Sequence, residues 1–106
     1  MEFLNRIEIL GTVGNVRVHE VGDSRVARVS VATDYSFKDR SGAMVIDTTW
    51  HSVTIWARKD DKEDISNIRT GCHLYVLGRI RQSRYTDVLG KEHTVSEIIA
   101  QSWQIK

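Results

Sequence analysis

The sequence predicts an all-β domain that contains one short helix. Stretches rich in Val, Ile, Thr and aromatic residues recur along the chain, turn-forming segments separate them, and a single link has helical character. The chain has 106 residues, no proline and one cysteine, which suits one small domain and excludes an intrachain disulfide. We therefore expect residues 1–106 to form a single domain.

Each expected strand alternates apolar and polar residues over most of its length. The strands are expected over 4–13, 25–33, 47–57, 73–85 and 94–105. Segments 20–24, 38–42 and 87–91 combine Gly with Asp or Ser, the residues that tight turns require.

The link between the third and fourth strands predicts a helix. Asp60 or Asp61 would cap its start, and Ile65 and Ile68 would share its apolar face. Gly71 would end it in the left-handed conformation.

Glycines mark positions where two long strands can bend sharply. Gly11 and Gly14 lie in the first strand, and Gly78 lies in the fourth. Three strands, a helix and two further strands, with these bends, form the element order of a five-stranded Greek-key barrel, the OB-fold. Other five-stranded barrels and sandwiches share much of this order.

Composition excludes several functional classes. No apolar run approaches the roughly 18 residues of a membrane span, and the N-terminus has no signal-peptide pattern, so we expect a cytoplasmic protein without a membrane partner. The four histidines and Cys72 lack metal-ligand spacing, so we expect no metal and no cofactor.

The formal net charge of +1 conceals an uneven distribution. Residues 60–64 carry four acids and one lysine, and the rest of the chain holds 14 basic against 10 acidic groups. Charge runs are usually solvated surface, but a basic surface is compatible with this total.

The third strand places tryptophan on its polar face. Alternation turns Val53 and Ile55 inward, whereas Trp50, Thr54 and Trp56 lie on the other side. A single tryptophan is more often buried, and finding both on the polar side favours a binding surface.

The fourth strand repeats this arrangement, and the segment after the second strand adds an aromatic ring between cations. We expect Leu74, Val76 and Ile80 in the core, and Arg79, Arg81, Ser83 and Tyr85 on the outer face. We expect Phe37 in a mobile loop with Lys38 and Arg40, and Trp103 packed in the core.

Aromatic rings interleaved with arginines suit single-stranded nucleic acid. Every base has a π-face that is worth about 1–3 kcal/mol on an aromatic side chain, and guanidinium groups bind phosphates. The acidic segment 60–64 suggests a metal-dependent nuclease as an alternative, but no nucleophile–base pairing supports it, and we expect no enzyme.

With these features in place, the chain resembles the bacterial single-stranded DNA-binding protein family over nearly its whole length. The resemblance rests on segments 5–11, 31–33, 49–53, 78–81, 85–87 and 94–98. It implies an OB-fold that protects single-stranded DNA during replication, recombination or repair, without strong sequence preference, in association with the nucleoid. It also implies a homotetramer, with a dimer as the alternative.

The resemblance assigns roles to individual residues. Bases would stack on Phe37, Trp50, Trp56 and Tyr85. The DNA backbone would contact Lys38, Arg40, Arg58, Arg69, Arg79, Arg81 and Arg84. First strands would pair edge to edge between subunits, with Asn5, Ile7, Ile9 and His51 at the oligomer interface. The alternative for His51, which composition alone favours, is a core histidine with a hydrogen-bond partner.

The end of the chain departs from this pattern. Typical members continue through a glycine-rich linker to an acidic tip that recruits replication and repair enzymes, whereas this sequence stops at Lys106. We therefore expect such recruitment to be missing or arranged otherwise. The alternative function is a dimeric accessory OB module of replication restart that acts mainly through protein contacts.

Overall fold

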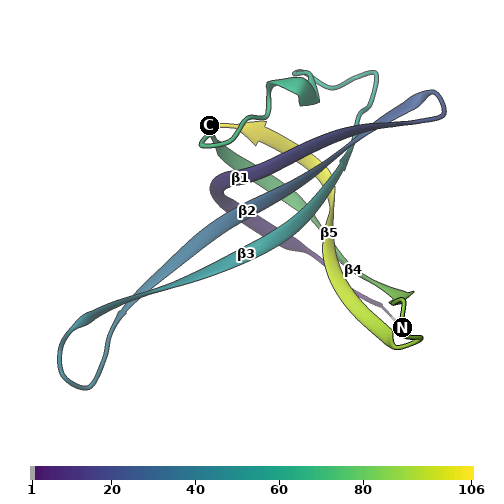
Figure 1. Cartoon of the computed structure of the whole chain (residues 1–106). Coiled ribbons are helices and arrows are strands. Elements are labelled where there is room, and N and C mark those ends of the chain that lie inside the picture. Colours follow the sequence, from purple (N-terminus) through teal and green to yellow (C-terminus); the bar gives the residue numbers. More distant parts are fainter. Residues whose placement is uncertain (1) are drawn as a thin grey trace.

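The computed structural model describes residues 2–106, which form a closed β-barrel with one 3-10 helix (Figure 1). The elements are β1 (Ile7–Val21), β2 (Ser24–Lys38), β3 (Met44–Trp56), η1 (Ile65–Asn67), β4 (His73–Thr86) and β5 (Glu92–Ile105). The strand order is β1-β2-β3-β5-β4, with β3 parallel to β5 and the other neighbouring pairs antiparallel. The all-β class and the element order are as predicted.

The short helix predicted between the third and fourth strands is present, but it is much shorter than expected over 60–71 and neither Asp60 nor Asp61 caps it. The structure has η1 alone in this link, and Asp64 caps it by accepting a 2.9 Å hydrogen bond from the backbone N–H of Ser66. Ile65 and Ile68 are both buried, as predicted, but Ile68 already has an extended backbone. Burying these two side chains takes only one short turn, so the chain does not continue as a helix.

Among the described residues, thirteen buried ones form the core of the barrel. β4 contributes Leu74 and Val76, as predicted, and Trp103 of β5 packs half-buried against the cluster. The prediction that Ile80 is a core residue is wrong, since its side chain is 45% exposed. A register shift at Leu77–Gly78 precedes it, and β4 leaves the barrel core from there.

Two of the predicted bends are places where backbones touch. A Cβ on Gly11 would lie 2.3 Å from the carbonyl oxygen of Ala32, and one on Gly78 would lie 2.2 Å from that of Ile99. The contact at Gly11 lies where β1 changes partners, from β4 over residues 7–12 to β2 over residues 12–21, and the contact at Gly78 lies at the register shift between β4 and β5. The close approach therefore closes the barrel.

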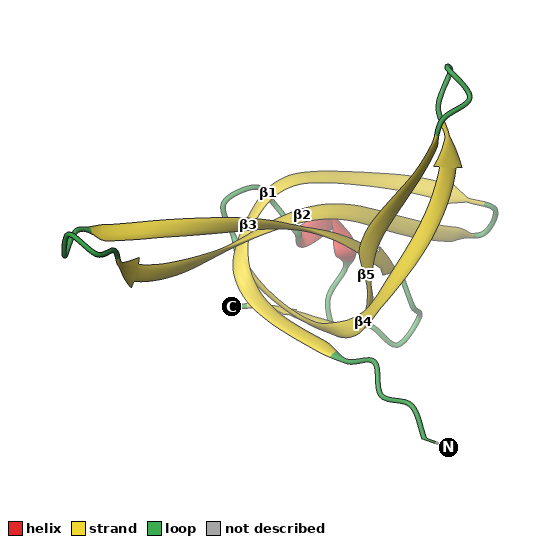
Figure 2. Ribbon diagram, turned by 90° about the horizontal axis from the view of Figure 1, so that it is seen from below, coloured by secondary structure: helices red, strands yellow, loops and turns green. Residues whose placement is uncertain are grey.

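Two hairpins extend beyond the barrel (Figures 1 and 2). In the β2–β3 arm, residues 33–49, and in the β4–β5 arm, residues 80–97, each strand pairs only with its hairpin partner among the described residues. The radius of gyration is 16.3 Å, against about 13 Å for an ordinary domain of this length. Phe37 lies within the first arm, opposite Val45, so the predicted mobile loop is wrong at this residue.

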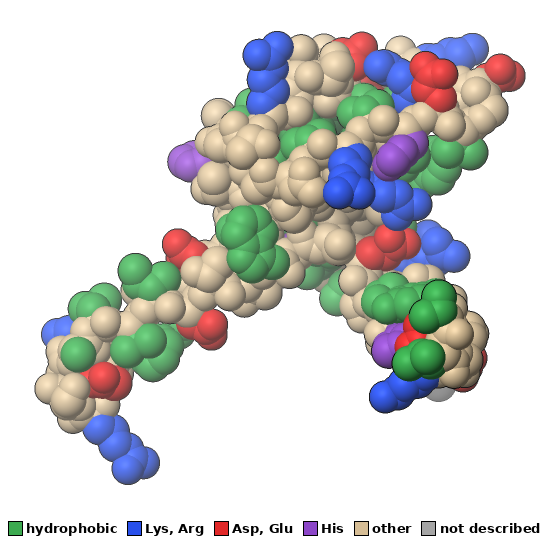
Figure 3. Space-filling model, in the orientation of Figure 1, with side chains coloured by type: hydrophobic (Ala, Val, Ile, Leu, Met, Phe, Trp, Pro, Cys, Tyr) green, Lys and Arg blue, Asp and Glu red, His purple; other side chains and the backbone are tan. Residues whose placement is uncertain are grey.

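Hydrophobic side chains gather on both arms (Figure 3). The exposed large apolar residues there are Tyr35, Phe37, Met44, Ile46, Ile80, Tyr85, Val88, Leu89 and Val95. Within residues 2–106, no helix is long and apolar enough to cross a membrane.

Candidate nucleic-acid interface

The four aromatic side chains that the sequence singled out all lie on the surface. Trp50 is 61% exposed, Tyr85 51%, Trp56 42% and Phe37 40%. The two tryptophans stand on β3, and the other two rings stand on the arms. None of these rings belongs to the core of the described chain, so each has surface available for a ligand.

Trp50 lies against a bulge in β1. A Cβ on Gly14 would be 2.6 Å from Cζ3 of the indole, so the glycine makes room for the ring. Thr70 donates a 2.8 Å hydrogen bond to the carbonyl oxygen of Gly14, which brings the segment with Arg69 to the same bulge. The structure thus brings the segment that carries Arg69 to the bulge against which Trp50 lies.

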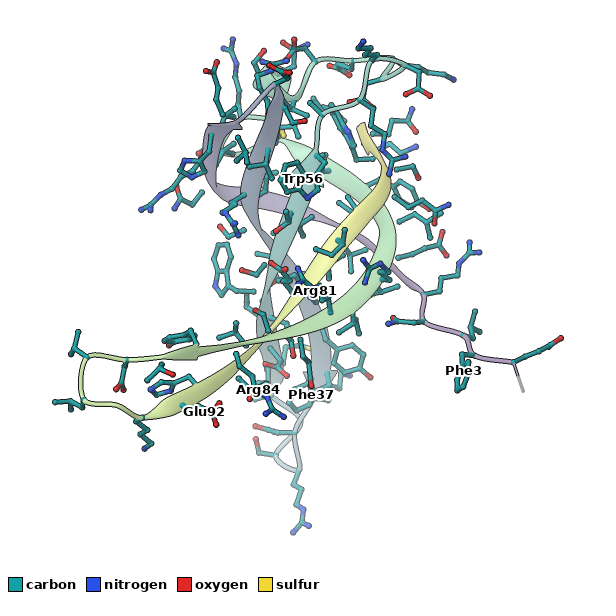
Figure 4. All side chains as sticks on the ribbon, turned by 90° about the vertical axis from the view of Figure 1, so that its right-hand side faces the viewer. Phe3, Phe37, Trp56, Arg81, Arg84 and Glu92 are labelled. Atoms are coloured by element: carbon teal, nitrogen blue, oxygen red, sulfur yellow. The ribbon has the colours of Figure 1, made fainter. Side chains whose placement is uncertain are left out.

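Trp56 ends β3 on its outer face, as predicted, but Thr54 beside it does not stay exposed. Thr54 is 6% exposed and donates a 3.0 Å hydrogen bond to Oε2 of Glu97. Arg81, on β4, also faces this carboxylate, with 3.6 Å between Nη1 and Oε1. In the view of Figure 4, Arg81 lies below Trp56, with Arg84 and Phe37 further down.

The β2–β3 arm carries two neighbouring aromatic rings. Tyr35 and Phe37 have ring centroids 6.1 Å apart and planes inclined by 30°. Tyr35 is 69% exposed. Its two-residue spacing from Phe37 on one strand was the signal for a shared face. Lys38 and Arg40 are exposed toward the end of this arm.

Tyr85 is covered on one face within the β4–β5 arm. His93, directly opposite it, stacks at a centroid distance of 5.0 Å and an angle of 18°. Asp87 holds this imidazole, with 2.7 Å between Oδ2 and Nε2. The hydrogen bond to His93, followed by that from the backbone N–H of Lys91, lowers the pKa of Asp87. One face of Tyr85 remains for a base, with Arg84 exposed on the same arm.

Arg58 and Arg79 line one hollow of about 490 Å³, together with Arg6. The hollow lies between the N-terminal segment, β4 and β5, and no acidic side chain is among its lining residues. The structure therefore brings together cations from three parts of the chain. An anionic group is the ligand that such a lining favours.

The residues expected at an oligomer interface have contacts within the chain. Asn5 exchanges two hydrogen bonds with the backbone of Ile80, at 2.7 and 2.9 Å. Ile9 is buried in the core and Ile7 packs against it. His51 is half-buried, with Nε2 2.8 Å from Oγ1 of Thr33. A contact between first strands would therefore use the backbone edge of residues 7–11, which within residues 2–106 pairs with β4 on one side only.

The acidic segment 60–64 lies beside η1. The capping hydrogen bond from Ser66 and the guanidinium of Arg25, 3.1 Å away, lower the pKa of Asp64 to about 2. Over residues 2–106, no three His, Cys, Asp or Glu side chains are grouped so that they could hold a metal ion.

The sequence matches the single-strand binding protein family over residues 4–106. The chain belongs to this family. The single-stranded DNA-binding protein of Neisseria meningitidis serogroup A is 33% identical over 100 residues, which make up 92% of this chain and 56% of that protein. That of Xanthomonas campestris pv. campestris is 30% identical over 105 residues, or 96% of this chain and 60% of that protein. The chain thus spans less than two thirds of these relatives.

Solved structures of the family have the same fold. The SSB of Plasmodium falciparum, determined in complex with ssDNA, matches with a TM-score of 0.81 and 23% identity over 99% of this chain and 95% of that chain. A deletion mutant of the single-stranded DNA binding protein from Thermus aquaticus matches with a TM-score of 0.78 and 17% identity over 97% of this chain and 50% of that chain. The predicted OB-fold and family are confirmed, and the family is a non-enzymatic one.

Proposed function

We propose that the chain binds single-stranded DNA without strong sequence preference. Bases stack on Phe37, Trp50, Trp56 and Tyr85, and phosphates contact Lys38, Arg40, Arg58, Arg69, Arg79, Arg81 and Arg84. The observation that carries this proposal is the 40–61% exposure of all four rings on a chain of this family. Single-strand binders commonly combine aromatic rings with a basic groove.

The positions of the rings suit a long ligand. Two rings lie on the barrel and two on arms that extend from it in different directions (Figure 2). A flexible single strand can follow such a path, whereas a rigid duplex keeps its bases stacked on one another. Stacking on a π-face also tolerates any base, which is the basis for the weak sequence preference.

Assembly into a homotetramer, or a dimer, accompanies this function in our proposal. The unpaired edge of β1 and the apolar side chains on both arms support it, because a monomer leaves this surface in water. Asn5, Ile7, Ile9 and His51 remain the predicted interface residues. A cytoplasmic, nucleoid-associated location and roles in replication, recombination or repair follow from the binding of single-stranded DNA.

The second candidate, a dimeric accessory OB module, has one specific observation in its favour. Val88 and Leu89, at the tip of the β4–β5 arm, are 101% and 90% exposed. Apolar side chains at such a tip suit a protein contact better than a phosphate backbone. A stable dimer with feeble affinity for single strands would support this candidate over the first.

Filter binding of labelled oligo-dT at about 50 mM salt tests the main proposal, since phosphate contacts are strong there. Trp50→Ala and Trp56→Ala should each weaken binding by about 1–3 kcal/mol while circular dichroism stays unchanged. Phe3→Ala is the matched control, because Phe3 is 87% exposed on the N-terminal segment away from the other rings (Figure 4). No binding by the unaltered chain would refute the proposal.

A further inference from the structure

Register places a row of charged side chains across the whole barrel. Arg17 of β1 lies directly opposite Arg28 of β2, and Arg28 lies directly opposite Thr54 of β3. Thr54 bonds to Glu97 of β5, which lies directly opposite Arg81 of β4. This transverse row follows the strand order β1-β2-β3-β5-β4.

The carboxylate of Glu97 lies between two guanidinium groups. Its Oε2 is 4.0 Å from Nη1 of Arg28, and its Oε1 is 3.6 Å from Nη1 of Arg81. The Glu97 side chain is only 18% exposed, whereas those of Arg28 and Arg81 are 59% and 56% exposed. At these distances the arginines keep most of their donors free for another anion.

The other end of the row brings two like charges together, of which only Arg28 faces a carboxylate, that of Glu97. Arg17 and Arg28 occupy directly opposite positions, an arrangement that destabilises a sheet. No ion pair of Arg17 is found within the described chain. A polyanion that crossed both side chains would remove this repulsion.

The row lies beside one of the aromatic rings. Trp56 is two residues beyond Thr54 on β3, so it shares the outer face and lies diagonally across from Arg28. A strand whose base stacks on Trp56 therefore has its next phosphates within reach of this row. The sequence gives little sign of Arg28, which stands alone between apolar residues.

We propose that Arg17 and Arg28 contact the DNA backbone, extending the phosphate path from Arg81 across β5, β3 and β2 to β1, and that Glu97 limits the affinity by competing for Arg28 and Arg81. This inference rests on the proposed function. It adds two phosphate contacts to that function. It also assigns a role to Glu97, whose negative charge holds Arg28 and Arg81 and so reduces their attraction for phosphates.

Salt-dependent titrations of oligo-dT test the two arginines. Arg17→Gln and Arg28→Gln should each make the slope of log K against log salt shallower by about 0.7, the value for one phosphate contact on a single strand. If a variant and the unaltered chain bind equally at about 1 M salt, this difference in slope makes the variant bind roughly five- to tenfold more weakly at about 50 mM salt. Lys62→Gln, in the acidic segment, is the control for an equal change of net charge.

Glu97→Gln tests the competing charge. It keeps an acceptor for Thr54 but removes the negative charge, so binding should become tighter and the slope steeper by about 0.7. Thermal unfolding of each variant excludes misfolding as the cause.

Three results would overturn the inference while the unaltered chain still binds. In the first, Arg17→Gln and Arg28→Gln both show the same affinity and salt slope as Lys62→Gln, which refutes the two phosphate contacts. In the second and third, Glu97→Gln leaves the affinity for oligo-dT unchanged or weakens it, and either result refutes the competing role of Glu97. If the unaltered chain does not bind oligo-dT, the proposed function itself has failed.

Discussion

Gly78→Ala should destabilise the barrel, because the new methyl group has no place to go. Its Cβ would lie 2.2 Å from the carbonyl oxygen of Ile99 and 3.0 Å from the carbonyl carbon, whereas ordinary contacts begin near 3.4 Å. The two backbones would have to separate by about 1.2 Å, and both belong to paired strands. No side-chain rotation relieves this contact.

The magnitude follows from two opposing terms. Overpacking of this kind costs about 1–3 kcal/mol, whereas replacing glycine by alanine restricts the unfolded chain and returns about 0.4–1 kcal/mol. The difference spans about 0–2.6 kcal/mol, and because the 2.2 Å contact joins two backbones we expect a loss in its upper part, about 1–2.5 kcal/mol. For a domain of this size, it lowers the Tm by roughly 5–15 °C.

Thermal unfolding at fixed protein concentration measures this effect, since assembly would make Tm depend on concentration. Gly14→Ala is the matched control, because its Cβ meets the far end of the Trp50 side chain instead of backbone. The reasoning is refuted if Gly78→Ala melts at the same temperature as the unaltered chain, or if Gly14→Ala lowers the Tm as much.

Three further outcomes are expected. Gly14→Ala should weaken oligo-dT binding and keep the fold, because its new Cβ would lie 2.6 Å from Cζ3 of Trp50 and displace the indole. An unchanged affinity in filter binding would contradict this. The pKa of Asp64 is lowered from 3.8 to about 2, so its carboxylate stabilises the fold above pH 3.8, and this contribution is lost as the pH falls through 2. Asp64→Asn should lack this part of the pH dependence of stability when unfolding is followed in acid. His93→Ala should raise the pKa of Asp87 toward its ordinary value, and an NMR titration that finds no rise would count against the hydrogen bond.

Local pattern was enough to predict most of the fold. Alternation located five strands, although β1 and β2 end at Val21 and Lys38 and not at the expected residues 13 and 33. The Gly-containing turns located the hairpins, because a turn depends on residues close together in the chain. The helix expected over 60–71 is much shorter in the structure because Asp64, not Asp60 or Asp61, makes the cap, and the core takes Ile65 and Ile68 from a single short turn.

The candidate site was predictable only where one strand decides which face a side chain takes. Trp50 and Trp56 share a strand, and alternation alone puts them outside. Thr54 follows the same alternation but is buried, because Glu97, 43 positions away, comes to lie over it. The prediction that Ile80 is a core residue fails for a similar reason, since the register shift at Gly78 depends on contact with β5. Pairing between distant strands cannot be read from one strand's pattern.

The proposed phosphate contacts of the transverse row would let a chain with a net charge of +1 bind a polyanionic ligand. Glu97 offsets cations inside the row itself, while the hollow lined by Arg58 and Arg79 has no acidic side chain among its lining residues. In our proposal, phosphate attraction is therefore moderated at the row by Glu97, and at the hollow by Glu8, which lies 3.9 Å from Arg6. Stacking, worth about 1–3 kcal/mol per base, then carries a larger share of the affinity than it would on a uniformly basic surface. A binder that relies on stacking is less sensitive to salt than one that relies on phosphates alone, because only the phosphate contacts release counterions.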